Sequence, residues 1–240
     1  GAVLAVKQVP EPPEPPLDRR HDPARERHPR EGLWGAQAGA DGLLVVTPYY
    51  SKPPQDALLA HFTAVADATQ LPVMLYDIPH RSGVPIETAT LIELAAHPRI
   101  VAVKDAKGLM VASSTVIAAT ELAYYSGDDA FTLPLLSVGG VGVVGTSTHF
   151  TGARTKTMIE KFLAGDLAGA IADNQSLLPV FTGVFATQGC MLVKAGLASR
   201  GVRPGDVVGV ALERGFALYP AQEEALLALA LGEHVILATP

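Results

Sequence analysis

Apolar and polar positions alternate in two different rhythms from residue 39 onwards. Short runs rich in Val, Ile and Leu predict buried β-strands at 42–50, 71–79, 99–106, 121–129 and 140–147. Amphipathic spacing predicts helices at 54–69, 87–96, 111–120, 131–138, 155–164, 167–181 and 188–200. Strands that alternate regularly with helices form a parallel sheet. The length of the repeat suits an α/β fold of the (β/α)8 TIM-barrel type better than a doubly wound nucleotide-binding sheet, and no GxxxxGK[ST] motif is present.

The chain divides by composition. Residues 8–31 combine proline with charges of both signs and have almost no β-branched or aromatic side chains. Burial cannot offset the ordering entropy of such a segment. We therefore expect a disordered or unrelated segment at 1–36, a partial barrel at 37–154 and a C-terminal helical region at 155–240.

Charge and cysteine content exclude several classes of protein. The net charge is −6, and no dense Lys/Arg stripe is present to hold nucleic acid phosphates. The single cysteine, Cys190, cannot form an internal disulfide, and we expect it to be a small core residue of an apolar helix. The most apolar stretch, 225–238, is interrupted at 232–234, so we expect no membrane span. A cytoplasmic protein is the expectation.

Reactive groups of a (β/α) barrel sit where strands end. The residues that end the five predicted strands are Tyr49 and Tyr50, Tyr76, Lys104, Gly127 and Asp128, and Val144. In the third strand, alternation places Ile100, Ala102 and Lys104 on one face. Val101 and Val103 fall on the other, so we expect Lys104 to point into the barrel.

A lysine inside an apolar barrel can become a nucleophile. Desolvation penalises the ammonium, lowers its pKa and leaves a neutral amine that can form a Schiff base with a carbonyl. The alternative is that Lys104 extends into solvent or pairs with Asp105. Lys107 is the competing nucleophile, but it follows the predicted strand and we expect it in solvent.

Two residues at the end of the second predicted strand and just after it suit the same chemistry. The Tyr76 phenol could relay protons to an imine, or could simply pack with its hydroxyl on a carbonyl. Arg81 could grip a carboxylate through two parallel hydrogen bonds, or remain a solvated charge. Tyr49 and Tyr50 suit an interface as well as a catalytic site.

Asp128 and Asp129 allow a metal or acid pair. No histidine lies beside them, and the seven histidines are scattered, which disfavours a zinc-dependent aldolase site. We expect no metal.

Five runs together resemble a known family. They are TPYYSKPPQ (47–55), LYDIPHRSG (75–83), VAVKDAKG (101–108), YYSGDD (124–129) and GGVGVVGTS (139–147). In order and spacing, residues 37–200 resemble the 4-hydroxy-tetrahydrodipicolinate synthase family, also called dihydrodipicolinate synthase. The resemblance implies a barrel lyase in which Lys104 forms an imine with pyruvate. The enamine then attacks aspartate semialdehyde, and ring closure releases the lysine.

The resemblance also implies roles for the other candidates. Tyr76 matches the central tyrosine of the proton relay, and Tyr50 the tyrosine that reaches across a tight dimer to complete it. Arg81 matches the arginine that holds the semialdehyde carboxylate. Gly127 and Val144 match backbone positions that line the pyruvate pocket.

Assembly and cofactor needs follow from the same resemblance. Members of the family are usually homotetramers, built as dimers of dimers, and Tyr49 matches a ring at the dimer interface. They need no metal or organic cofactor. N-acetylneuraminate lyase is the alternative relative. Its pattern lacks an arginine at the position of Arg81, and it carries a tyrosine in a GYDE run where this chain has GDD.

The resemblance fails at the N-terminus. The family barrel has three βα units before the first strand predicted here, and its second strand ends in a Gly-Thr-Thr-Gly-Glu loop that is absent from this sequence. About 38 residues cannot supply three units of about 30 residues each. We therefore expect an incomplete barrel with strands 4–8, and a catalytically impaired remnant or assembly subunit remains an alternative.

Overall fold

The computed structural model describes residues 40–186, 189–199 and 201. The described residues fall into two compact units that divide after Gly183, and each unit is described by itself. The predicted disordered or unrelated segment at 1–36 lies outside the described residues. So does the part of the predicted helical region that follows residue 201. No helix within these described ranges is long and apolar enough to cross a membrane.

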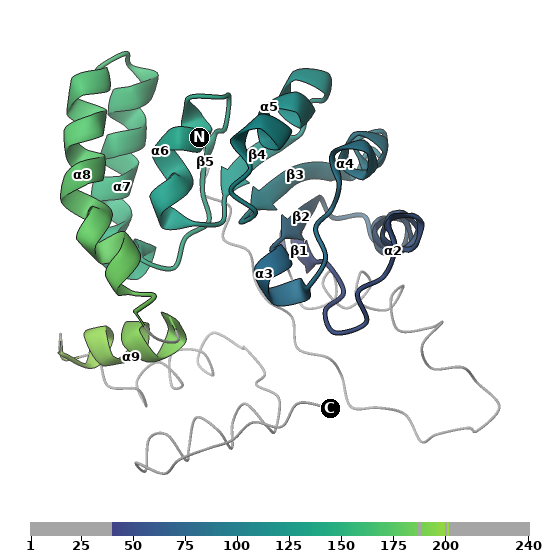
Figure 1. Ribbon diagram of the computed structural model, residues 1–240, viewed down its shortest axis with the longest axis horizontal. Coiled ribbons are helices and arrows are strands. Elements are labelled where there is room, and N and C mark those ends of the chain that lie inside the picture. The colour runs from purple at the N-terminus through teal and green to yellow at the C-terminus, as the bar shows by residue number, and fades with distance from the viewer. Residues whose placement is uncertain (1–39, 187–188, 200, 202–240) are drawn as a thin grey trace, which may run out of the picture. The chain divides into compact units, whose positions relative to one another are not determined.

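The first unit contains a parallel sheet. Its strands are β1 (Leu43–Val46), β2 (Val73–Asp77), β3 (Ile100–Asp105), β4 (Ala123–Ser126) and β5 (Gly142–Val143). They lie side by side in chain order, and every neighbouring pair is parallel (Figure 1). This confirms the predicted βα alternation. Among the described residues the sheet is open, with β1 and β5 at its edges.

Helices connect and follow these strands. In the first unit they are α2 (Gln55–Asp67), α3 (Pro79–Ser82), α4 (Thr88–Leu94), α5 (Met110–Ala119), the 3-10 turn η1 (Asp129–Phe131), α6 (Thr132–Leu136), α7 (Thr148–Leu163) and α8 (Leu167–Gly183). Figure 1 shows α2, α4 and α5 along one face of the sheet. The second unit contains α9 (Gly189–Ser199).

The helix α3 was not predicted. Pro79 was assigned to the end of a strand, but it occupies the first turn of α3, where its missing N–H costs nothing. Gly83 ends the helix at φ 83°, a left-handed conformation that glycine adopts without strain, and its N–H donates to the Pro79 carbonyl at 2.8 Å. The prediction of extended chain through Pro79 is therefore wrong.

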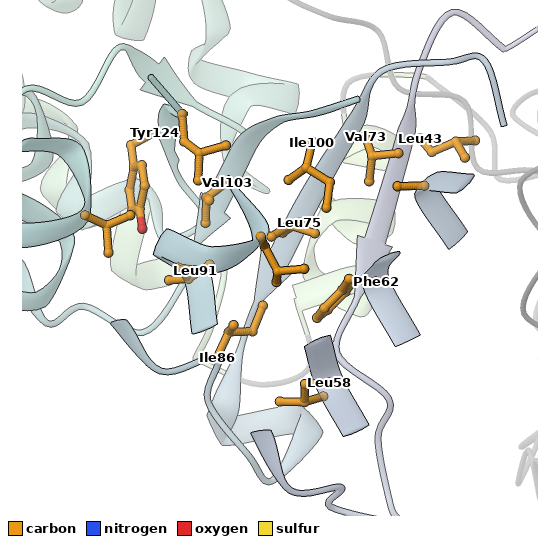
Figure 2. Packing of buried hydrophobic residues seen from close by; sticks show 14 of the residues in the cluster. Leu43, Leu58, Phe62, Val73, Leu75, Ile86, Leu91, Ile100, Val103 and Tyr124 are labelled. Atoms are coloured by element: carbon orange, nitrogen blue, oxygen red, sulfur yellow. The ribbon is translucent and has the colours of Figure 1, made fainter. Parts of the chain in front are cut away.

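The core lies between the sheet and the helices α2, α4, α5 and α6. Leu58, Phe62 and Ala66 recur every four residues on α2, so they share one buried face. Figure 2 shows Leu58 and Phe62 of α2 in one cluster with Leu75 of β2 and with residues of the neighbouring strands. Burying this face fixes the helices on one side of the sheet. Alternate residues of each strand then face the other side.

One prediction about β3 is wrong. Strict alternation put Ile100 on the same face as Lys104 and opposite Val103. Instead Ile100 and Val103 both belong to the helix-side core, and Val101 is 40% exposed. The pairing skips a residue, since Val73 pairs with Ile100 and Met74 with Ala102. This irregularity inverts the facing of Ile100, and alternation holds from Ala102 onwards.

The first predicted strand is less buried than expected. Leu43 is buried, but the remaining residues of β1 are only half-buried. Within the described residues β1 pairs on one side alone, with β2, so its other edge lacks a covering strand.

Cys190 is exposed, which contradicts its prediction as a core residue. The buried positions of α9 are Gly189 and Val193, four residues apart on one face. Cys190 follows Gly189 by one residue, about 100° around the helix, and therefore leaves that face.

Candidate active site

The carboxyl edge of the sheet brings Lys104 and Tyr76 together. The two residues are direct register partners on β3 and β2, and the Lys104 Nζ atom lies 3.9 Å from the centroid of the Tyr76 ring. Their neighbours Leu75 and Val103 belong to the helix-side core. Alternation therefore directs Tyr76 and Lys104 to the face of the sheet away from the helices. The predicted meeting of phenol and amine is confirmed.

The surroundings of Lys104 make its ammonium easier to deprotonate than that of an exposed lysine. Partial burial lowers the pKa of Lys104, and the negative charge of Asp129 opposes part of that decrease. The alternative pairing with Asp105 is not what forms. Asp105 instead accepts hydrogen bonds from the Lys107 N–H at 2.8 Å and from the Ser113 hydroxyl. The amine of Lys104 is thus left for chemistry on the open face.

Tyr76 lies in the field of Arg81. Burial raises the pKa of the Tyr76 phenol, and the Arg81 guanidinium opposes part of that rise. The phenol is therefore protonated at neutral pH and can donate a hydrogen bond. Arg81 lies exposed in α3, at the rim that follows β2. An exposed guanidinium at a strand end can meet a carboxylate that approaches from solvent.

Gly127 makes room for the lysine. Its N–H donates to the Asp105 carbonyl at 2.7 Å, which extends the β3–β4 ladder past Lys104. A Cβ atom at this position would lie 2.9 Å from the Ala106 Cβ and 3.1 Å from the Lys104 Cγ. Val144 follows β5 in the same way, its N–H donating to the last carbonyl of β4 at 2.8 Å. Both residues lie at the edge where Lys104 emerges.

The two aspartates of the GDD run hold backbone at the starts of helices: Asp128 caps η1, and Asp129 bonds the two residues before α7. Asp128 accepts from the Ala130 N–H at 3.0 Å and caps η1. Asp129 is buried and accepts from the Thr146 N–H at 3.0 Å and the Ser147 hydroxyl at 2.7 Å, just before α7. Within the ranges that the structure describes, no group of three His, Cys, Asp or Glu side chains is placed to hold a metal ion.

Lys107 contradicts its prediction. It was expected in solvent, but its side chain is 8% exposed. Its N–H donates to the Asp105 carboxylate, which turns the chain back, and its Nζ reaches Asp77 Oδ2 at 2.6 Å and the Ile86 carbonyl at 3.0 Å. This buried ion pair was missed because the only sequence clue was an Asp directly after Tyr76, 30 residues before Lys107.

Tyr49 and Tyr50 are not brought to Lys104. Their side chains are 68% and 94% exposed, and Tyr50 has a left-handed backbone with φ 69°. Positive φ is uncommon for a bulky residue. The loop begins at Thr47, which is fully buried and donates through its N–H to the Tyr76 carbonyl at 3.2 Å. Thr47 therefore fixes the beginning of the loop, while the rings of Tyr49 and Tyr50 remain exposed.

Comparison with known proteins decides the family. The model of the dihydrodipicolinate synthetase family matches residues 34–210. This chain belongs to that family. It is 67% identical over 172 residues to the 4-hydroxy-tetrahydrodipicolinate synthase of Cutibacterium acnes, and 55% identical over 195 residues to that of Kineococcus radiotolerans. These matches cover 72% and 81% of this chain, and 59% and 61% of the relatives.

Solved structures of the family agree with the fold. The enzyme of Cyanidioschyzon merolae, solved with lysine bound, superposes with a TM-score of 0.71 at 37% identity. That match covers 85% of this chain and 70% of the other. DapA-2 of Bacillus anthracis gives a TM-score of 0.70 at 37% identity and covers 72% and 60%. The fold is thus of the TIM-barrel type, with five parallel strands in the described residues.

Proposed function

We propose that this chain is a Schiff-base-forming lyase that condenses pyruvate with L-aspartate 4-semialdehyde to 4-hydroxy-tetrahydrodipicolinate. That reaction belongs to the diaminopimelate route of lysine biosynthesis. The observation that carries the proposal is the partly buried Lys104, whose pKa is lowered and whose Nζ lies 3.9 Å from the Tyr76 ring centroid. Relatives that bear the synthase name, at up to 67% identity in the matches above, support the synthase over an N-acetylneuraminate lyase-like aldolase.

The chemistry begins at the neutral amine. The Lys104 nitrogen adds to the ketone carbon of pyruvate, and Tyr76 donates the proton with which the carbinolamine hydroxyl leaves as water. Loss of a methyl proton from the imine gives an enamine, whose carbon attacks the aldehyde of the semialdehyde. The amine of that substrate then attacks the imine carbon, closes the ring and releases Lys104.

The remaining candidates bind and assemble. Arg81 pairs with the semialdehyde carboxylate, while Gly127 and Val144 line the pyruvate pocket. Tyr50 completes the proton relay of a neighbouring copy, and Tyr49 packs at the same interface. The exposure of both rings supports this, since an exposed aromatic pair is typical of an interface. We place the reaction in the cytoplasm, in a homotetramer, without metal or organic cofactor.

A second candidate is a catalytically impaired assembly subunit. This chain spans about 59% of the length of its Cutibacterium acnes relative, and its sequence contains no Gly-Thr-Thr-Gly-Glu run. An assembly subunit would keep Tyr49, Tyr50 and the long helices for assembly but would not catalyse the reaction.

Exchange of the pyruvate methyl protons tests the proposal. In D2O, imine and enamine formation replaces these protons with deuterium, which NMR detects without any second substrate. We expect exchange with the full chain and with Lys156→Met, a surface control on α7, and none with Lys104→Met. Consumption of the semialdehyde is the second readout.

The two candidates give opposite results. Exchange followed by semialdehyde consumption supports the lyase. Exchange of the pyruvate methyl protons without consumption of the semialdehyde would mean that the imine and enamine form but the condensation does not occur, which rejects the full reaction. Absence of exchange in a folded full chain rejects the lyase and favours the assembly subunit.

A further inference from the structure

We infer that Asp77 and Lys107 are positioning residues, whose buried ion pair sets the spacing between Tyr76 and Lys104 from the opposite face of the sheet. The inference rests on the proposed function for the reaction that this spacing serves. It concerns residues that touch neither pyruvate nor the semialdehyde in the proposed mechanism.

The pair is buried and fully engaged. The side chains of Lys107 and Asp77 are 8% and 1% exposed, and the Nζ to Oδ2 distance is 2.6 Å. Both side chains also form a hydrogen bond with the backbone of Ile86. Its carbonyl accepts from Lys107 Nζ at 3.0 Å, and its N–H donates to Asp77 Oδ1 at 3.1 Å. The pair therefore ties the ends of β2 and β3 to the segment that leads into α4.

Each member is connected to one residue of the site. Asp77 follows Tyr76 directly on β2. The backbone N–H of Lys107 donates to the carboxylate of Asp105, and Asp105 follows Lys104 directly on β3. Tyr76 pairs with Lys104 in register, and Asp77 pairs with Asp105. A relative shift of the two strand ends would therefore change the distance between the phenol and the amine.

The use of charge makes this tie specific. Asp77 and Asp105 are both buried on the helix side, and the Ser113 hydroxyl bonds the oxygen of Asp105 that Lys107 leaves free. Two buried carboxylates side by side need a compensating cation. Burial of one face already specifies which residues pair. The bond of 2.6 Å between the Lys107 ammonium and Asp77 adds a fixed contact between the two strand ends.

The test uses the double variant Asp77→Asn/Lys107→Met in the full chain. It removes one charge of each sign and preserves both side-chain shapes, so the net charge near Lys104 is unchanged. The matched control, Lys161→Met/Asp173→Asn, removes an ion pair of 2.8 Å between α7 and α8. Only the first pair lies behind the site.

Two quantities are measured for the unmodified chain and for both double variants, each normalised to the amount of folded protein. The first is the pH at which Lys104 is half-modified by acetic anhydride, followed by peptide mass spectrometry. We expect this midpoint to rise in Asp77→Asn/Lys107→Met, because a displaced lysine regains solvent. The second is pyruvate methyl exchange, which should slow by about tenfold or more at saturation, with half-saturating pyruvate changed by less than about threefold.

The outcomes separate this inference from the proposed function. An unchanged midpoint with exchange within about twofold of the unmodified chain overturns the positioning role. If the unmodified chain shows no exchange, the proposed function fails, and the midpoint alone decides the positioning role. If the double variant does not fold, Asp77→Asn replaces it. Loss of that negative charge alone would lower the Lys104 midpoint, so a rise supports displacement, whereas a fall or no change overturns it.

Discussion

Three neighbours shape the surroundings of Lys104. Burial near the Tyr76 ring lowers its pKa, Asp129 limits that decrease, and Gly127 leaves space for its stem. Desolvation lowers the pKa of the amine, and it also lowers the stability of the folded chain while the amine is protonated.

Replacement of Lys104 by Met should therefore stabilise the fold at neutral pH. A lysine with a lowered pKa binds its proton less tightly when folded than when unfolded, so the penalty is fully present below the folded pKa. It fades as pH rises towards about 10.4, the ordinary lysine value. Urea unfolding of the unmodified chain and Lys104→Met at several pH values measures the gain. A gain that grows with pH would contradict the account.

Replacement of Gly127 by Ala should impair both stability and imine formation. The new methyl would lie 2.9 Å from Ala106 Cβ and 3.1 Å from Lys104 Cγ, closer than carbon atoms pack. Such overpacking costs about 1–3 kcal/mol. Urea unfolding and pyruvate methyl exchange are the measurements. Gly152→Ala, where an added Cβ meets nothing within 4 Å, is the control and should retain exchange.

Single residues were predictable where local alternation decides their direction. The side of the sheet taken by Lys104 follows from alternation after Ala102. Ile100 lies before the irregular pairing, which depends on β2 and leaves no mark in the sequence of β3 itself. Lys107 was misplaced because its partner, Asp77, lies 30 residues away.

At the scale of elements, α7 begins directly after two residues that a distant carboxylate holds. The helix was predicted from residue 155, but it starts at Thr148. Asp129 bonds the Thr146 and Ser147 N–H groups from 17 and 18 residues away. A hydrogen-bond acceptor supplied by another element cannot be recognised from the sequence around the helix. The strand order, by contrast, follows from the regular alternation of strands and helices.

Replacement of Asp129 by Asn should therefore destabilise α7 and also act on Lys104. The amide has one acceptor oxygen instead of two, so about 1–3 kcal/mol of stability should be lost. Loss of the negative charge should lower the pKa of Lys104 further, because Asp129 raises it. Thermal unfolding and pH-dependent acetylation of Lys104 report the two effects.

Asp128→Asn is the matched control. Asn caps helices about as well as Asp, so both readouts should stay close to those of the unmodified chain. An equal loss in both variants would contradict a specific role for Asp129.

At the scale of the whole molecule, the described residues form an open parallel sheet with a single core on its helix side. The family fold was predictable because five motifs lie at strand ends in the right order. The strand pattern does not predict an assembly, and Tyr49 and Tyr50 are exposed in this chain. The amine, the phenol and the guanidinium nevertheless meet at one edge within this chain.

Trapping of the imine tests the central claim most directly. The full chain is incubated with pyruvate, reduced with borohydride, digested and mapped by mass spectrometry. We expect one reduced pyruvate adduct, on Lys104, which is retained in Lys156→Met and absent in Lys104→Met. An adduct on Lys107, or no adduct on a folded chain, would contradict that claim.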